Sequence, residues 1–189
     1  TCVTEHEAII GTCKGLEKDG YRVTYLPVQK DGRINLQELS AAITDKTILI
    51  SIMAANNEIG VIQPIAEIGA IAKEKGILFH TDAVQMVGKV PFNVIDLKVD
   101  MASLSAHKMY GPKGVGALYV RRRNPRVLLA AIIDGGGHER GMRSGTLNVP
   151  GIVGFGKAAE ICRLEMATES QRLRALRDSL SDKRHKGLD

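Results

Sequence analysis

Strand-length apolar runs alternate with helix-length segments along this chain, and this alternation is the strongest constraint on its fold. The clearest run is TILISIMA (47–54), and ILFHTDA (77–83) and DMASLSA (100–106) follow it. TILISIMA is apolar at almost every position instead of every second one, which predicts a strand covered on both faces. Strands separated by helices predict crossover connections and hence parallel pairing. The sequence therefore predicts an α/β fold, a three-layer sandwich with a mainly parallel sheet.

Capping and turn residues predict the other elements. Thr4 and Glu7 have the spacing of a capping box for a helix that ends at Gly20. Further predicted elements are strands YRVTYLPV (21–28) and GALYVRR (116–122), short helices from Asn35 to about Ile43 and from Pro64 to about Gly76, a loop over 134–148, and a final helix from about Pro150 towards residue 180.

The composition favours one ordinary globular domain. The 189 residues are 44% hydrophobic, which is enough for a real core. The net charge of +5 comes largely from two basic clusters, 121–123 and 183–186, which are typical of solvated surface. With three Phe, four Tyr and no Trp, the chain offers no obvious stacking platform for single strands. No apolar run approaches the length of a bilayer span. We therefore expect neither direct nucleic-acid binding nor membrane insertion.

The three cysteines, Cys2, Cys13 and Cys162, are odd in number, widely spaced and without a CxxC pair. This pattern argues against a disulfide framework or a zinc site and fits a reducing compartment. We expect a bacterial cytoplasmic location, with the mitochondrial matrix as the alternative. Because the chain begins at Thr1 without Met, we also expect it to be a fragment.

Polar side chains gather just past the ends of three predicted strands. In a parallel sheet, ligands bind beyond the carboxyl ends of the strands, so these residues are the candidates for a binding site. They are Asn57 after the first strand, Asp82 and Gln85 after the second, and Ser105, His107 and Lys108 after the third, with His6 in the first turn of the opening helix.

Three common phosphate or metal motifs are incomplete in this chain. Lys108 precedes its glycines and Lys113 is followed by Gly114, so neither completes a P-loop. The turn after Lys108 lacks the third glycine of GxGxxG, because position 119 is Tyr119. HERGM begins like a zinc-protease helix, but Met142 stands where the second ligand should be. The sequence therefore predicts no metal site.

A lysine and a carboxylate at neighbouring strand ends fit the needs of a pyridoxal cofactor. Such a cofactor takes a lysine amine for its Schiff base and a carboxylate beside its ring nitrogen. Lys108 and Asp82 offer these groups, and Ser105 and His107 could hold a phosphate. The alternative is that each residue is an isolated polar end-cap. Their common place at one sheet edge weakens that alternative.

Five segments resemble class V aminotransferase-fold enzymes. VDMASLSAHKMYGPKGVGALYV (99–120) resembles the cofactor-attachment signature of that group. The other four segments are similar to a cysteine desulfurase of the iron–sulfur cluster assembly type, in register to about residue 180. They are TEHEA (4–8), NNEIGVIQPI (56–65), HTDAVQMVGK (80–89) and GGGHERGMRSGTLNVPGIVG (135–154). The resemblance implies the large domain of a fold-type I transferase dependent on pyridoxal 5'-phosphate (PLP), incomplete here.

The resemblance also implies roles for individual residues. Lys108 would carry the cofactor as a Schiff base and move protons, Asp82 would pair with the pyridinium nitrogen, and His6 would lie against the ring and assist proton transfer. Asn57 and Gln85 would bind near the substrate and the ring hydroxyl, Ser105 and His107 would bind the phosphate, and Thr146, with Arg143 beside it, would join them from the second subunit of a homodimer.

The implied activity is conversion of L-cysteine to L-alanine with an enzyme persulfide, which supplies sulfur to acceptors such as an iron–sulfur scaffold and to tRNA thiolation. The family's persulfide cysteine, its substrate-binding arginine and its upstream phosphate segment have no counterpart here, so we expect the fragment alone to be inactive. Residues 1–150 would be the central part of the PLP-binding large domain, and 151–189 a long helix leading towards a missing small domain. The alternatives are a selenocysteine lyase, another class V enzyme, or a non-catalytic interaction module.

Overall fold

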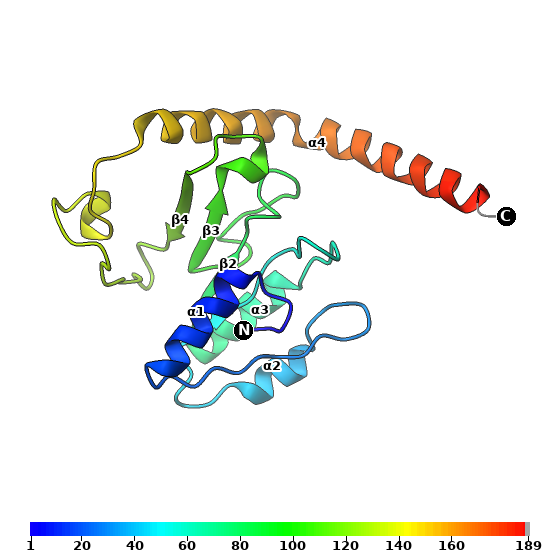
Figure 1. Cartoon of the computed structure of the whole chain (residues 1–189). Coiled ribbons are helices and arrows are strands. Elements are labelled where there is room, and N and C mark those ends of the chain that lie inside the picture. The colour runs from blue at the N-terminus through cyan, green and yellow to red at the C-terminus, as the bar shows by residue number, and fades with distance from the viewer. Residues whose placement is uncertain (188–189) are drawn as a thin grey trace.

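The chain folds around a four-stranded sheet whose first three strands run parallel. A computed structural model describes residues 1–187, and its strands are β1 (Leu49–Ser51), β2 (Leu78–Asp82), β3 (Met101–Ser105) and β4 (Gly116–Val120). They lie side by side in that order, and Figure 1 labels β2, β3 and β4. The pairs β1–β2 and β2–β3 are parallel, and β3–β4 is antiparallel. The prediction of a mainly parallel sheet is confirmed.

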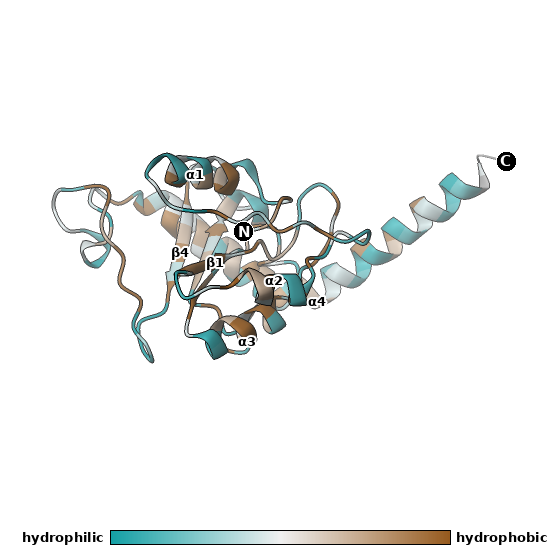
Figure 2. Ribbon diagram, turned by 90° about the horizontal axis from the view of Figure 1, so that it is seen from below, coloured by the Kyte–Doolittle hydropathy of each residue, from teal (hydrophilic) through white to brown (hydrophobic). Residues whose placement is uncertain are grey.

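Helices cover both faces of this sheet. They are α1 (Glu7–Lys18), α2 (Leu36–Ala42), α3 (Ile65–Lys75) and α4 (Val149–Lys186), together with the short 3-10 helices η1 (Ala106–Met109) and η2 (Glu139–Gly141). α1 lies on one side of the strands, and α2 and α3 lie on the other (Figure 2). α4 packs against η1 and then extends beyond the sheet. These are the three layers that the sequence predicts.

The two faces of the sheet differ in polarity. Along β2, Phe79 and Thr81 are buried, and Phe79 belongs to the same core cluster as Ile68 of α3. His80 and Asp82 alternate with them, so their side chains point to the other face, where both are half-buried. The face towards α3 is therefore the apolar core, whereas the carboxyl-terminal part of β2 carries polar side chains on the face towards α1.

The start of α1 differs from the sequence prediction. α1 begins at Glu7, and its N-cap is His6, whose Nδ1 accepts a hydrogen bond from the Ala8 amide at 3.2 Å. The predicted capping box of Thr4 and Glu7 is therefore wrong. Asn56 Nδ2 donates to the Thr4 carbonyl at 2.8 Å, which holds the chain before His6 close to the end of β1 instead of in the helix.

The segment YRVTYLPV (21–28) is not a strand. Within residues 1–187 it makes two isolated bridges, Cys2–Leu26 and Val28–Ile34. Residues rich in β-propensity form a ladder only where a neighbouring strand is available. The neighbour of Leu26 is the short segment 1–3, which leaves after one bridge because Thr4 is held elsewhere.

The run TILISIMA is only partly a covered strand. β1 spans three of its residues, and the chain stays extended to Ala54, with the Ile52 amide donating to the His80 carbonyl at 3.2 Å. Ile52 and Ala54 are fully buried, whereas Ile48 and Leu49 are exposed. β1 is the edge strand of the sheet, where fewer neighbours cover side chains. The prediction of burial on both faces is therefore right only for the second half of the run.

The predicted boundaries at Asn35 and Gly76 are confirmed. Asn35 Oδ1 accepts hydrogen bonds from the amides of Gln37 at 2.8 Å and Glu38 at 3.4 Å, at the start of α2. α3 begins just after Pro64 and ends at Gly76, whose φ is 68°. Only a residue without a Cβ adopts this left-handed conformation readily, so the turn from α3 into β2 depends on Gly76.

Replacing Gly76 by alanine is expected to lower the free energy of unfolding by about 1 kcal/mol, because a left-handed conformation costs an L-residue that much. No described atom lies within 4 Å of the added Cβ, so the effect comes from the backbone alone. Gly15→Ala is the matched control. Its Cβ also meets open space, but Gly15 lies inside α1, where alanine gains about 0.5–1 kcal/mol. Urea titrations in which both variants shift in the same direction would contradict this account.

Candidate active site

Three strand ends meet at one edge of the sheet. β2 ends at Asp82 and β3 ends at Ser105. The extension of β1 stays paired with β2, because the Ala54 amide donates to the Asp82 carbonyl at 2.8 Å. The Ala83 amide donates to the Ser103 carbonyl at 3.0 Å and ties β2 to β3. These bonds fix the edge at which the sequence predicts the site.

Asp82 presents its carboxylate on the polar face of the sheet. Its Oδ1 accepts a hydrogen bond from the Val84 amide at 3.0 Å, which orients the carboxylate at the strand end. Burial raises the pKa of Glu5, and the charge of Asp82 raises it further. Burial lowers the pKa of His80, and Asp82 opposes that change. The field of Asp82 therefore reaches two titratable groups, the buried Glu5 and the half-buried His80.

Lys108 stands on η1, directly after β3. Ala106 and Met109 of η1 are buried, and the Gly111 amide donates to the Ala106 carbonyl at 2.9 Å. These contacts anchor the turn, while the Lys108 side chain is half-buried. Tyr110 then turns the chain away in a left-handed conformation with a φ of 61°. The amine is therefore carried by a rigid turn at the same edge as Asp82.

Polar side chains around Lys108 are paired with one another. Ser105 Oγ lies 2.8 Å from His107 Nδ1, and Lys89 Nζ donates to Gln85 Oε1 at 3.0 Å. Partial burial lowers the pKa of Lys89, and the charge of Lys108 lowers it further, so the two ammonium groups are neighbours. A hydroxyl, an imidazole and two cations in one place favour an anionic ligand.

Four predicted site residues lie on the surface. The exposed His6 caps α1, and His107 is exposed on η1. Asn57 is exposed in the loop after the β1 extension, and Thr146 is exposed in the loop before α4. Arg143 of that loop donates from Nη1 to the Gly145 carbonyl at 3.1 Å. The roles of these residues towards a ligand or a second subunit stay predictions.

Glu5 is a buried group of this region that the sequence analysis missed. Its side chain is only 8% exposed. Its Oε1 accepts hydrogen bonds from the Met53 amide at 2.7 Å and the Cys2 thiol at 3.2 Å. Burial raises the pKa of Glu5 to about 7. A glutamate beside a surface histidine carries no sequence signal of burial, because its partner Met53 comes from a distant segment.

His80 is the second group that the sequence analysis missed. Its Nδ1 lies 2.8 Å from Ser51 Oγ, and its Nε2 lies 2.9 Å from Ser103 Oγ. The sequence did indicate that His80 lies near the site. His80 stands two residues before Asp82 in a predicted strand, so the two side chains must share one face of the sheet.

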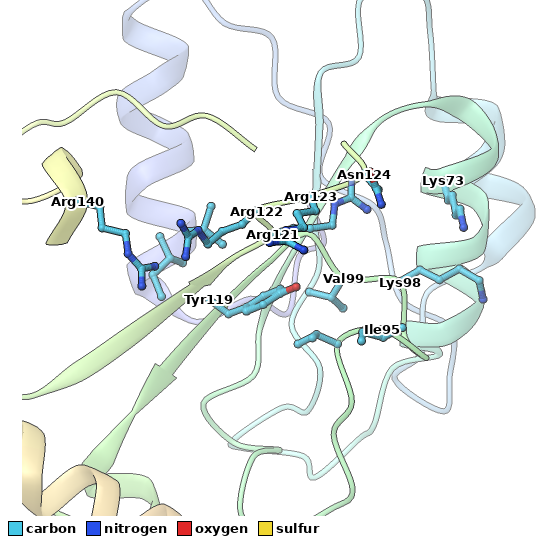
Figure 3. Close-up of a pocket in the computed structure, with 13 residues that line it drawn as sticks. Lys73, Ile95, Lys98, Val99, Tyr119, Arg121, Arg122, Arg123, Asn124 and Arg140 are labelled. Carbon is cyan, nitrogen blue, oxygen red and sulfur yellow. The ribbon is translucent and has the colours of Figure 1, made fainter. Parts of the chain in front are cut away.

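A cleft at the opposite edge of the sheet is lined by cations. It has a volume of about 820 Å³ and lies at the carboxyl end of β4, which meets the amino end of β3 (Figure 3). Lys98, Arg122 and Arg123 are among its lining residues, and Arg121 pairs with buried Asp100 at 2.6 Å. None of the described residues that line the cleft is an aspartate or a glutamate. It therefore lacks the lysine–carboxylate combination of the other edge.

The described residues contain neither a helix that could span a membrane nor a cluster of metal ligands. Across residues 1–187, every helix is too short or too polar to cross a bilayer. The same part of the chain contains no group of three or more His, Cys, Asp or Glu side chains placed as metal ligands.

The chain matches one protein family over nearly its whole length. The family model described as aminotransferase class-V matches residues 1–187. A cysteine desulfurase IscS of Anaeromyxobacter sp. (strain Fw109-5) is 64% identical over all 189 residues, which correspond to 46% of that relative. The chain thus spans about half the length of the curated relatives it matches.

Two solved structures are similar to this chain in both fold and sequence. A NifS-like protein superposes with a TM-score of 0.91 at 46% identity, over 96% of this chain and 49% of that one. The structure of SspA in complex with cysteine gives a TM-score of 0.80 at 48% identity, over 84% of this chain and 46% of that one. The resemblance found in the sequence is confirmed, and the chain belongs to the aminotransferase class-V family.

Proposed function

We propose that this chain is the cofactor-binding part of a PLP-dependent cysteine desulfurase, which converts L-cysteine to L-alanine and leaves the sulfur as an enzyme persulfide. The observation that carries the proposal is the half-buried amine of Lys108 on a rigid turn, at the sheet edge where Asp82 presents its carboxylate. The IscS relatives and the SspA structure with cysteine support the choice of substrate.

The side chains at the strand ends fit PLP. Asp82, oriented by a backbone amide, offers a carboxylate to a protonated ring nitrogen. The paired Ser105 and His107 offer donors to a phosphate. The carbonyl oxygen of Gln85 is already engaged, which leaves its amide nitrogen to donate to a ring hydroxyl. When bound, the cofactor supplies an aldehyde for the Lys108 amine and a ring that withdraws electrons from the substrate.

The chain's own residues would then handle substrate and protons. Lys108 Nζ would take and return the proton at the substrate's α-carbon, which a positioned amine can do. His6 would exchange protons on the exposed side of the site, where it caps α1. Asn57 would hold the substrate from the loop after the β1 extension.

We further propose a homodimer in which Thr146 contributes to the second subunit's phosphate site. Apolar side chains near this loop support an interface there, since Ile132 is 94% exposed and Leu128 is 75% exposed. We also propose sulfur acceptors such as an iron–sulfur scaffold, a further role in tRNA thiolation, and a bacterial cytoplasmic location; the similar bacterial proteins named cysteine desulfurase IscS are consistent with this proposal. Residues 1–150 would form the central part of the large domain, and 151–189 the helix leading out of it, although residues 188–189 lie outside the described part of the chain.

The proposal is tested by substrate turnover in the protein that contains this chain. With bound PLP and dithiothreitol, L-cysteine is expected to yield L-alanine and sulfide in equal amounts, measured by amino-acid analysis and a sulfide assay. Turnover of L-selenocysteine with no turnover of L-cysteine would instead identify a selenocysteine lyase. Failure to convert either substrate, in protein that holds PLP, would contradict the proposed function.

A further inference from the structure

Three side chains form a hydrogen-bonded chain across the polar face of the sheet. Ser51 of β1 and Ser103 of β3 bond to the two ring nitrogens of His80 on β2, at 2.8 and 2.9 Å. Ser51 is the register partner of His80, and Ser103 is the register partner of Asp82. Because both nitrogens are engaged, the orientation of the imidazole is fixed from both sides. His80 stands two residues before Asp82 on β2, so the two side chains share one face of the sheet.

The surroundings of His80 favour an uncharged ring. Serine hydroxyls can donate or accept, so they accommodate either protonation state. Burial disfavours the charged ring and lowers the pKa of His80, while the charge of Asp82 opposes the change. β1 and β3 contribute only the uncharged hydroxyls of Ser51 and Ser103. Asp82 is a charged group whose field acts on this imidazole.

We propose that His80 is a positioning residue for Asp82. The uncharged His80 ring ties the three strands together at the site, through Ser51 and Ser103, without neutralising the carboxylate beside it. Asp82 is then available as a full anion to a ligand's protonated ring nitrogen. This inference rests on the proposed function, since such a ring nitrogen belongs to PLP. A protonated His80 would compete for the same carboxylate and weaken cofactor binding.

The coupling between the two side chains can be measured without cofactor. The pKa of His80 is followed by NMR of histidine-labelled protein, with His80→Gln used to assign the signal. The expected pKa lies below the ordinary value of 6.5. It should fall further, by about half a unit or more, in Asp82→Asn, which removes the charge and keeps an oxygen acceptor for the Val84 amide. An unchanged His80 pKa in Asp82→Asn would overturn the inference.

Cofactor affinity provides the second readout. Apparent PLP affinity is measured from pH 8 down to pH 5 in the protein containing this chain, in His80→Gln, and in the control His185→Gln, whose ring is exposed near the end of α4. PLP affinity should fall between pH 8 and pH 5 in all three proteins. The fold-loss in His80→Gln should be at most about one third of the fold-loss in the other two proteins. If His80→Gln weakens PLP binding equally at every pH, the role of His80 is structural alone and the inference is overturned.

The two proposals fail in different ways. If the unaltered protein binds no PLP at any pH, the proposed function fails, whatever the NMR titration gives. If PLP binds but His80 does not respond to Asp82→Asn, only the positioning role fails. If His80→Gln does not fold, the NMR comparison of the unaltered protein with Asp82→Asn decides the inference by itself.

Discussion

Replacing Glu5 by glutamine is expected to remove a pH-dependent loss of stability of about 3 kcal/mol. Burial raises the pKa of Glu5 from its ordinary 4.5 to about 7, and each unit corresponds to about 1.4 kcal/mol. The carboxylate is costly to ionise because the side chain is buried. Its Oε2 also lacks a hydrogen-bond partner within the described part of the chain.

The loss grows as the pH rises. Below pH 4.5 the carboxyl group is protonated in both the folded and the unfolded chain. Between pH 4.5 and about 7 the folded protein keeps a proton that the unfolded chain has released, so the free energy of unfolding falls. Above about pH 7 both states are ionised and the full loss remains. Asp82 adds to the raised pKa, while the hydrogen bonds from the Met53 amide and the Cys2 thiol oppose it.

Urea titrations at pH 4.5, 6 and 8 test this prediction. The free energy of unfolding of the original protein, minus that of Glu5→Gln, should fall by about 3 kcal/mol across this range. Glutamine keeps an oxygen to accept from the Met53 amide, so the local backbone contact survives. Glu7→Gln, at an exposed position two residues on, is the control and should change stability by less than about 0.5 kcal/mol. A difference for Glu5→Gln that does not vary with pH would contradict the prediction.

Replacing Lys108 by alanine is expected to reduce L-cysteine turnover at least about 1,000-fold, because the same amine binds the cofactor and moves the proton. The stability change should stay within about 1 kcal/mol, since Lys108 is only half-buried and η1 is anchored by Ala106 and Met109. Lys113→Ala is the matched control, because Lys113 is exposed in the turn after η1. Near-normal turnover by Lys108→Ala, or equal losses in both variants, would contradict the assignment.

The sheet was predictable where each strand has its partners within the chain. ILFHTDA, DMASLSA and GALYVRR pair with one another or with β1, and their predicted positions are confirmed. YRVTYLPV has an equally suitable composition but meets only single-residue neighbours, so it forms bridges instead of a ladder. Composition predicts what a segment can become, and its neighbours decide whether it does.

The candidate site was predictable to the extent that it follows from topology. Asp82, Ser105 and Lys108 gather at one edge because parallel strands place their carboxyl ends together. Glu5 and His80 depend on bonds to residues 48 and 23 positions away, and no local pattern encodes those bonds. The sequence therefore predicted the ends of the strands but not the polar contacts that support them.

The central claim is that one amine, Lys108, meets the cofactor's aldehyde beside Asp82, and trapping that bond tests it most directly. The protein is loaded with PLP, reduced with borohydride, digested, and mapped by mass spectrometry. The account predicts one modified lysine, Lys108, and no modified peptide after Lys108→Ala. Modification of the neighbouring Lys89 instead, or a label that persists in Lys108→Ala, would contradict it.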